Sequence, residues 1–449
     1  MKVKNGIILK NVIMLDGSIN MNETKTSILI RNNIIEEIGY GIEGNYKTID
    51  LDGKYIIPGL INLHVHLPGS GKVHKKTKDN TKLVNLLTSH KLLRPIGFMI
   101  EKKYARVELN SGVTTLRSVG GIDTFDTELR DKINSGKIIG PRIIASNYAL
   151  APLDGHMLGT VSKLVENEEE AVKMVQDLAS SKVDLIKLMI TGGVIDAVKL
   201  GEPGVLKMDP RVVKAAVSKA HELGLKVSAH TESYEGVKVA LLNGVDTIEH
   251  GANLDTELIE LFKKNNSSLI ITMSPGSVIS LLSLDKTHVS EFVRYNSTVV
   301  SKNILDGIRL ALKENVSIGL GNDVGCPFVF HYDFYRELEW FTKSLNVDRK
   351  YTLYIATLNN AKIIGMDNSI GSIEKGKFAD LVVLNKNPLD DFKNLRDINM
   401  VIKDGKIIKN HKNKVNKKAE LMLDELFNVN IDEEFKKYFE THNEENVML

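Results

Sequence analysis

Cysteine is almost absent from this chain of 449 residues, which contains only Cys326. A single cysteine excludes a disulfide within the chain and fits a reducing compartment, so we expect a cytoplasmic protein. An excess of charge of one sign is also lacking, because 59 lysines and arginines against 57 acidic residues leave a formal net charge of +2. Without an overall basic field, we expect no nucleic-acid partner.

Long apolar runs are missing as well. The chain has no continuous apolar stretch of about 18 residues, so we expect neither a membrane span nor a membrane partner. The N-terminal sequence MKVKNGIILKNVIMLDG has a lysine inside its apolar stretch and no cleavage site of small residues. We therefore expect no secretory signal peptide.

The two ends of the chain share one pattern. Residues 1–56 alternate short β-like runs with turns, as in TSILIRNNIIEEIG, and the same texture returns over residues 366–412 in GSIEKGKFADLVVLN. The composition, 42% hydrophobic and 26% charged, is that of a globular protein. We expect a small β-sandwich built from both ends beside a larger domain.

The middle of the chain, residues 57–365, alternates apolar strands with helices. One helix is predicted in DPRVVKAAVSKAHELG, with Asp209 as N-cap, Pro210 in the first turn and Gly224 as its end. Several strands are continuous apolar runs, typical of parallel strands covered on both faces. This alternation predicts an α/β fold, a (β/α)8 TIM barrel, whose active site lies where the strands end. The eight expected strands are Tyr55–Leu63, Val113–Val119, Arg142–Ala145, Val183–Ile190, Leu225–Ala229, Val245–Glu249, Ser268–Thr272 and Val316–Leu320.

Two charged segments suggest no chemistry by themselves. The loop after the first strand carries the basic run GKVHKKTK, which is either a solvated surface or a lid that meets acidic groups of a substrate. Residues 413–449 form a charged tail that is predicted to be helical in KKAELMLDELF. We expect the tail to pack on the barrel or on a partner subunit of a homo-oligomer.

Histidines and an aspartate mark the ends of predicted strands. His64 and His66 occupy alternate positions in IIPGLINLHVHLPG, so their imidazoles point to the same side of the strand. His230 lies in VSAHTES, His250 in TIEHGAN and Asp323 in IGLGNDVG. Imidazole and carboxylate are ligands of zinc-type ions. Each residue alone fits a structural role, such as a satisfied core histidine or a helix N-cap, but together they predict a metal site.

Lys187 lies in DLIKLMITGG, a strand too apolar to favour an ammonium group. Burial of an unpaired ammonium costs roughly several kcal/mol. One interpretation is a buried ion pair. The other is an amine with a lowered pKa that captures carbon dioxide, whose carbamate would bridge two cations about 3.5–4 Å apart.

The motifs PGLINLHVH, IKLMITGGV, HTES, TIEHG and GND occur in the order of the ligand motifs of the amidohydrolase superfamily, which the chain resembles over nearly its whole length. The subgroup that it most resembles contains dipeptidases and carboxypeptidase-like enzymes with a carboxylated lysine, including Xaa-Pro and Xaa-Arg/Lys dipeptidases. The resemblance implies that His64, His66 and Asp323 hold one metal ion. It implies that His230 and His250 hold a second ion, with the modified Lys187 between the two.

Four further residues are candidate substrate contacts: His156, Arg117, Tyr234 and His331. His156 in LAPLDGHMLG matches a loop histidine that contacts substrate in similar enzymes. Tyr234 would polarise the scissile carbonyl, although relatives often carry this tyrosine closer to the strand-five histidine, where this chain has Glu232. Arg117 would pair with a substrate carboxylate or with a structural acid. Glu232 would favour a cationic substrate group or would be solvated.

These residues predict a metal-dependent amidohydrolase, with two zinc-type ions, that cleaves the amide bond of a dipeptide or an N-acyl amino acid. A hydroxide bridging the ions would attack the carbonyl, and Asp323 would carry its proton to the leaving nitrogen, with His156 and Tyr234 in the catalytic set. One alternative is a non-peptide amidase or a cyclic amide or imide hydrolase, similar to imidazolonepropionase or phenylurea hydrolase. Another is a non-catalytic barrel scaffold, which loss of ligands would mark, and no ligand is lost from the sequence.

Overall fold

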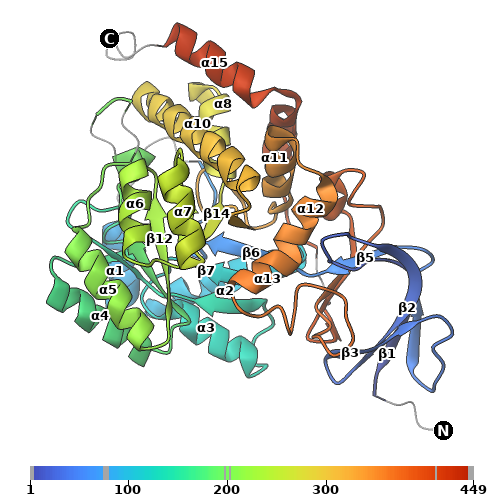
Figure 1. The fold of residues 1–449 in the computed structure, drawn as a ribbon. Helices are drawn as coiled ribbons and strands as arrows, with labels where there is room; N and C mark the ends of the chain where they lie inside the picture. Colours follow the sequence, from blue (N-terminus) through green and yellow to red (C-terminus); the bar gives the residue numbers. More distant parts are fainter. Residues whose placement is uncertain (1–4, 74–79, 197–198, 202–203, 410–411, 443–449) are drawn as a thin grey trace.

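The computed structural model describes residues 5–73, 80–196, 199–201, 204–409 and 412–442. Parallel strands with helices around them form the middle of the chain, and strands from both ends lie side by side in a separate sheet (Figure 1). Most of the basic run GKVHKKTK lies outside the described residues, so both interpretations of that loop stay open.

The separate sheet has eight strands, in the order β18-β17-β16-β5-β1-β2-β3 with β4 paired to β1. One edge of β1 pairs with β2, and the other pairs first with β4 and then with β5. A core of its own, which includes Leu9, Ile28 and Leu381, is buried in this part. Both ends of the chain thus contribute strands, while their division into the two layers of a sandwich stays a prediction. The bounds are β1 (Ile7–Leu15), β2 (Glu23–Arg31), β3 (Ile34–Gly39), β4 (Lys47–Asp50), β5 (Tyr55–Pro58), β16 (Leu381–Leu384), β17 (Ile398–Lys403) and β18 (Lys406–Ile407).

The expected first strand of the middle, Tyr55–Leu63, is wrong as a single element. Its first half is β5, which pairs with β16 in the terminal sheet, and its second half begins β6 (Leu60–Val65), which pairs with β7. The break falls at Pro58 and Gly59. Proline has no backbone N–H to donate, and a Cβ on Gly59 would lie 2.0 Å from Thr114 Oγ1, so only glycine fits at this crossing.

The middle contains two parallel sheets, of orders β6-β7-β8 and β10-β9-β11-β12-β13-β14-β15. The other seven expected strands each overlap one of these elements. The remaining bounds are β7 (Val113–Ser118), β8 (Arg142–Ala145), β9 (Ala149–Ala151), β10 (Ser162–Leu164), β11 (Leu185–Met189), β12 (Lys226–Thr231), β13 (Thr247–His250), β14 (Ser268–Ile271) and β15 (Ser317–Leu320).

These two sheets are connected at both edges. At one edge β8 pairs with β7, and β9, which follows after residues 146–148, pairs with β11. At the other edge a β-bridge joins Val65 to Val324, and the Asp323 N–H donates to His64 O at 3.0 Å. This second connection brings the end of β15 against the end of β6, where the first two histidines lie.

Helices surround the parallel strands (Figure 1). The predicted helix after Asp209 is confirmed as α5. Asp209 is its N-cap, and the Arg211 backbone N–H donates to Asp209 Oδ1 at 2.8 Å. Among the helices of the described residues, none has the length and apolar character that crossing a bilayer requires. The bounds are α1 (Thr81–Ser89), α2 (Arg94–Asn110), α3 (Phe125–Asn134), α4 (Glu168–Ser180), α5 (Pro210–Glu222), α6 (Tyr234–Leu242), α7 (Thr256–Asn265), α8 (Ser274–Leu281), α9 (Leu284–Thr287), α10 (Glu291–Lys313), α11 (Tyr335–Leu345), α12 (Arg349–Tyr354) and α13 (Asn360–Ile363).

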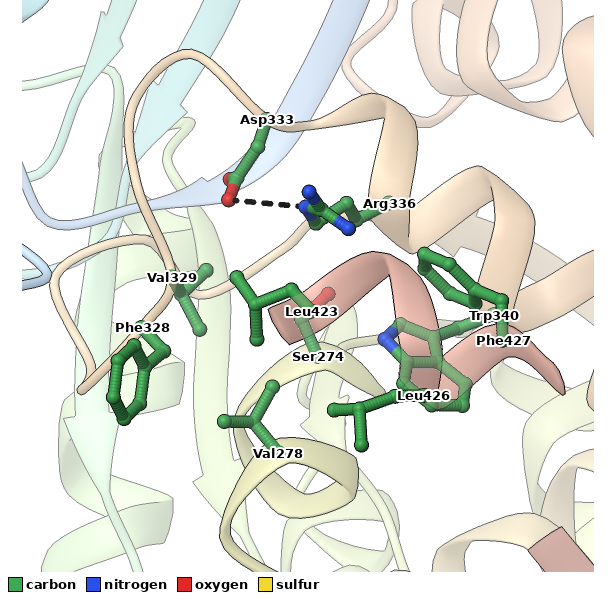
Figure 2. A pocket seen from close by; sticks show the side chains of 10 residues that line it. All are labelled: Ser274, Val278, Phe328, Val329, Asp333, Arg336, Trp340, Leu423, Leu426 and Phe427. Carbon is green, nitrogen blue, oxygen red and sulfur yellow. Dashed lines mark ion pairs between the residues drawn. The ribbon is translucent and has the colours of Figure 1, made fainter. Parts of the chain in front are cut away.

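The C-terminal tail is helical and packs on its own chain. Arg336 of α11 is buried and lies 3.1 Å from Glu420 Oε1 and 2.7 Å from Asp424 Oδ1. The ring of Trp340 lies 4.7 Å from that of Phe427, in the same region of contact (Figure 2). Buried charges and aromatic rings thus attach the tail to α11. Its elements are α14 (Lys417–Glu425), the single turn η4 (Leu426–Asn428) and α15 (Ile431–Thr441).

Candidate metal centre

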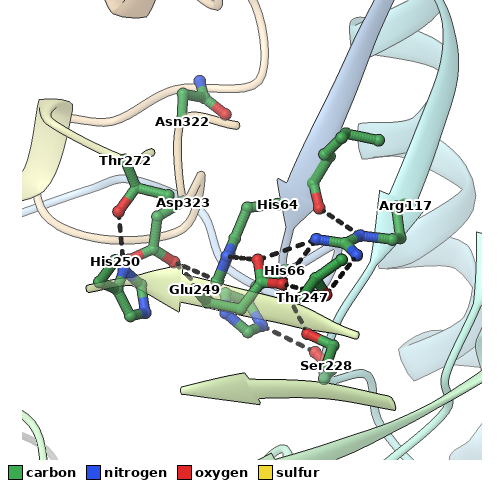
Figure 3. A network of polar contacts seen from close by, with 12 residues as sticks. His64, His66, Arg117, Ser228, Thr247, Glu249, His250, Thr272, Asn322 and Asp323 are labelled. Carbon is green, nitrogen blue, oxygen red and sulfur yellow. Dashed lines mark hydrogen bonds and ion pairs between the residues drawn. The ribbon is translucent and has the colours of Figure 1, made fainter. Parts of the chain in front are cut away.

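Five of the predicted metal ligands converge where parallel strands end, and Figure 3 shows four of them, His64, His66, His250 and Asp323. The Nε2 atoms of His64 and His66 lie 3.4 and 3.3 Å from Asp323 Oδ1. The ring centroid of His250 lies 4.8 Å from that of His64 and 4.7 Å from that of His230. One donor atom each from His64, His250 and Asp323 lies within 4.8 Å of the other two. Neutral imidazoles and a carboxylate at such spacing can share bound metal ions.

The backbone bends sharply at two of these ligands. His250 and Asp323 have φ of 66° and 51°, in the left-handed region that is uncommon for residues other than glycine. Gly321 allows β15 to approach β6, because a Cβ there would lie 2.4 Å from the His64 backbone nitrogen. The chain therefore leaves both strands in a way that places these side chains beside the first-strand histidines.

Hydrogen bonds at Nδ1 hold three of the imidazoles. For His64 and His66 the partners are acceptor oxygens, so Nδ1 carries the proton and Nε2 has its lone pair free for a metal. Burial lowers the pKa of His64 to about 4 and the pKa values of His230 and His250 well below their usual range, which favours the neutral form that binds metals. The Nδ1 distances are 2.8 Å from His64 to Glu249 Oε2, 2.9 Å from His66 to Gly120 O and 2.7 Å from His250 to Thr272 Oγ1.

Lys187, the sixth predicted ligand, lies on β11 next to the strand that carries His230. Its side chain is 1% exposed, and within the described part of the chain its Nζ has no hydrogen-bond partner. Burial lowers the pKa of Lys187 to about 8, although the charge of Glu249 opposes this effect. A buried polar group without a partner requires an explanation such as a missing ligand. The residues present therefore fit a pair of divalent ions with a modified lysine.

Glu249 is a site residue that the sequence reasoning missed. Its carboxylate is fully buried, contacts His64 Nδ1 and accepts two hydrogen bonds from Arg117 Nη2, at 2.7 and 2.9 Å (Figure 3). Burial alone would raise its pKa, but Arg117 holds it well below the ordinary range. A glutamate inside the apolar strand TIEH was the available signal, since it is as exceptional there as Lys187 is in its strand. Two hydroxyls also donate to Oε1, from Ser228 at 2.7 Å and from Thr247 at 2.9 Å.

The structure places Arg117, a predicted substrate contact, outside the lining of the cavity beside the histidines. Its side chain is buried below the histidines, where Nε donates to Leu63 O at 2.7 Å and Nη1 to Thr247 Oγ1 at 2.9 Å. Together with the bonds to Glu249, these contacts engage all three nitrogen atoms of the guanidinium group. Arg117 therefore supports the carboxylate that orients His64, and it is the structural ion pair that the sequence left as an alternative.

His331, another predicted substrate contact, also lies outside the cavity lining. It is 2% exposed, with Nδ1 at 3.0 Å from Glu108 Oε1 and Nε2 at 2.8 Å from Gly69 O, and it stacks on Tyr104 with ring centroids 4.4 Å apart. Both ring nitrogens are thus engaged within the protein. The histidine holds the loop after β6 against α2 rather than facing the cavity.

Tyr234, predicted to polarise the scissile carbonyl, is likewise placed away from the histidines. It begins α6, and its hydroxyl donates to Asp255 Oδ2 at 2.8 Å at the N-terminus of α7. This carboxylate raises the pKa of the Tyr234 hydroxyl, and the residue does not line the cavity beside the histidines. The extra distance from His230 in the sequence places the ring at the surface.

A cavity of about 570 Å³ opens onto the ligand cluster, a size typical of small-molecule sites. His156 lines it and stacks on His230, with ring centroids 4.3 Å apart and planes 9° apart. Glu232 and Cys326 also line it, and the Cys326 thiol donates to Asp323 Oδ2 at 3.5 Å. His156 is therefore placed where the sequence predicts a substrate contact.

Comparisons with known proteins agree with this geometry. The profile of the amidohydrolase family matches residues 55–408. An ochratoxinase from Aspergillus niger is 24% identical over 384 residues, which cover 79% of this chain and 75% of the ochratoxinase. A solved structure of a candidate prolidase from Bifidobacterium longum has 33% identity and a TM-score of 0.82, and covers 95% of this chain and 100% of its own. A solved structure of a Xaa-Pro dipeptidase with methionine in its active site has 30% identity and a TM-score of 0.79. The match covers 90% of this chain and 100% of the dipeptidase chain.

Proposed function

This chain belongs to the amidohydrolase family and is a hydrolase of carbon–nitrogen bonds, and we propose that it is a metal-dependent dipeptidase or carboxypeptidase. The observation that carries the proposal is a cluster of neutral histidines, an ionised aspartate and a buried lysine that together line one cavity. The likeness at 30% and 33% identity to a Xaa-Pro dipeptidase and a candidate prolidase supports a peptide-like substrate. We propose a dipeptide or an N-acyl amino acid.

The proposed architecture is a (β/α)8 barrel over residues 57–365, a β-sandwich from residues 1–56 and 366–412, and the tail of residues 413–449. The pairings of β8 with β7, of β9 with β11 and of Val65 with Val324 support closure of the barrel. In such a barrel the carboxyl ends of the strands surround one site. This arrangement explains why ligands far apart in the sequence lie together.

The proposed metal site holds two divalent ions, with zinc as the expected metal. Bound there, the ions would polarise the substrate carbonyl and lower the pKa of water toward about 7. Glu249 and Gly120 O orient the first two histidines, and Thr272 orients His250. The proposed ligands are His64, His66 and Asp323 for one ion, His230 and His250 for the other, and Lys187 for both.

Lys187 would join the two ions as a carbamate. The neutral amine attacks carbon dioxide, an N–C bond forms between Nζ and the carbon, and one proton leaves to solvent. The product carries one negative charge and two oxygens, so a single side chain can contact two cations. The lowered pKa of Lys187, about 8, supports this step because a larger fraction of the amine is neutral near pH 7 than in an exposed lysine.

Asp323 would carry the proton during hydrolysis. Burial opposes its ionisation, but the neighbouring His64 and His66 hold its pKa well below the ordinary range, so the carboxylate is ionised. Its Oδ1 faces these histidines, while its Oδ2 accepts a hydrogen bond from the Cys326 thiol. Transfer of the accepted proton to the leaving nitrogen would complete cleavage. His156 would contact the substrate from the cavity wall.

The likeness to an ochratoxinase supports a second candidate, a non-peptide amidase that uses the same residues. A panel of dipeptides, N-acyl amino acids, anilides and cyclic imides separates the two. We expect amino acids to be released from members of the first two classes, and chelation to stop their release. His64→Ala protein from an identical purification is the control for contaminating peptidases. Cleavage confined to anilides or cyclic imides would select the second candidate.

A further inference from the structure

We infer that the cavity beside the metal centre is a subsite for a large apolar substituent of the substrate, and that the C-terminal tail forms part of its wall. This inference rests on the proposed function, since it concerns the substrate of the same site. It adds the chemical character of that substrate and a specificity-determining residue, Ile431.

Apolar side chains make up most of the cavity wall outside the metal ligands. Helices α1, α8 and α10 contribute side chains that include Leu83, Leu87, Ile279, Val300 and Ile304. Among the described lining residues, the charged side chains beyond the proposed ligands are Lys72 and Glu232. Binding of an apolar group against such a wall is favourable because apolar surface on both partners leaves water. A small polar substrate would leave most of the volume unfilled.

Ile431, the first residue of α15, is part of this wall and is 4% exposed. Two contacts between α15 and α10 hold it there: Asp432 pairs with Arg309 at 2.5 Å, and the Tyr438 hydroxyl donates to Glu291 Oε1 at 2.5 Å. The family profile ends at residue 408, so Ile431 lies outside the residues that the profile matches.

The tail also lies close to segments that form this wall. Helix α8 presents Ile279 to the cavity, while its Val278 lines a second, small pocket together with the tail residues Leu423, Leu426 and Phe427 (Figure 2). The loop after Asp323 behaves in the same way. Its residues 325–327 line the cavity, and residues 328–329 lie on the side of the tail. Each of these segments is thus packed between substrate space and the tail.

Straight-chain carboxylates from acetate to octanoate test the subsite without any need for turnover. The probes share one carboxylate and differ only in apolar length, and their affinities for the full, metal-loaded chain are measured by titration calorimetry. Each buried methylene changes affinity about 4-fold. We expect the dissociation constant of the wild-type protein to fall by about this factor per methylene until the cavity is filled. An affinity that does not depend on chain length would overturn the apolar subsite.

Two substitutions test the role of the tail. Ile431→Trp fills part of the cavity, so the gain in affinity with chain length should stop at a shorter carboxylate. Ile431→Ala should weaken the binding of octanoate by about 4- to 10-fold without weakening the binding of acetate. The control is Leu421→Ala, on α14 of the same tail, whose side chain is 70% exposed and should bind like wild type. Thermal unfolding identifies variants that do not fold. If folded Ile431→Ala and Ile431→Trp both keep the wild-type dependence on chain length, Ile431 has no role in the subsite.

The two proposals can fail separately. A steep dependence on chain length in a protein that cleaves no dipeptide or N-acyl amino acid would leave the subsite standing and overturn the proposed function. Cleavage of these amides by a protein whose carboxylate affinity is independent of length would do the reverse.

Discussion

Replacement of Lys187 by alanine is expected to remove nearly all amide hydrolysis, and short carboxylic acids are expected to restore part of it. The variant loses the group that would join the two metal ions, so at least one ion should be held weakly. Formate, acetate or propionate can enter the space that the lysine leaves and supply two oxygens in the same place. The measurements are kcat and metal content, each with and without added carboxylate.

Lys187→Arg is the matched control for this rescue. Arginine keeps a cation and fills the space, but its guanidinium stays protonated and cannot capture carbon dioxide. It should be inactive and should not respond to carboxylates. Full activity of Lys187→Ala would contradict the proposed bridge. An unmodified ammonium in metal-loaded protein supplied with bicarbonate would also contradict it.

Asp323→Asn is expected to lower kcat by about 10²–10⁴-fold, the usual value of general acid–base assistance, which is about 3–5 kcal/mol in the barrier. Asparagine keeps the size and one oxygen donor but cannot accept the proton. KM and the melting temperature should change little, because the substitution removes no apolar contact. Steady-state kinetics and thermal unfolding on one preparation measure these effects together.

The matched control is Asp209→Asn, at the exposed N-cap of α5, where asparagine is also a good cap. It should leave kcat unchanged. Near-wild-type kcat in Asp323→Asn would remove Asp323 from the mechanism. A loss of stability with kcat retained would assign it a purely structural role.

The positions of the six proposed ligands could be predicted because each lies at or near the end of an apolar strand. Parallel strands end at a common edge, so their order along the chain is enough to place the residues together. The split at Pro58 and Gly59 was harder to foresee, because an apolar run on both sides of a proline can belong to one strand or to two. In the structure the two halves pair with different partners, β16 and β7, which lie far apart in the sequence.

The substrate contacts were less predictable because their orientation depends on partners far along the chain. Arg117 turns toward Glu249, 132 residues away, and His331 toward Glu108, 223 residues away. No local pattern reveals such pairs. The tail is a similar case: its helical pattern is visible in KKAELMLDELF, but the contact of Ile431 with the cavity depends on how α15 packs against α10. The cytoplasmic location and the homo-oligomer stay predictions.

Metal content is the measurement that tests the central claim most directly. Elemental analysis of active wild-type protein, dialysed to remove loose ions, should find about two divalent ions per chain, as in binuclear hydrolases. His64→Ala measured in parallel should hold about one fewer and should lose nearly all turnover while its circular dichroism stays that of the wild type. Wild-type protein that hydrolyses amides at full rate with no bound metal would contradict the account.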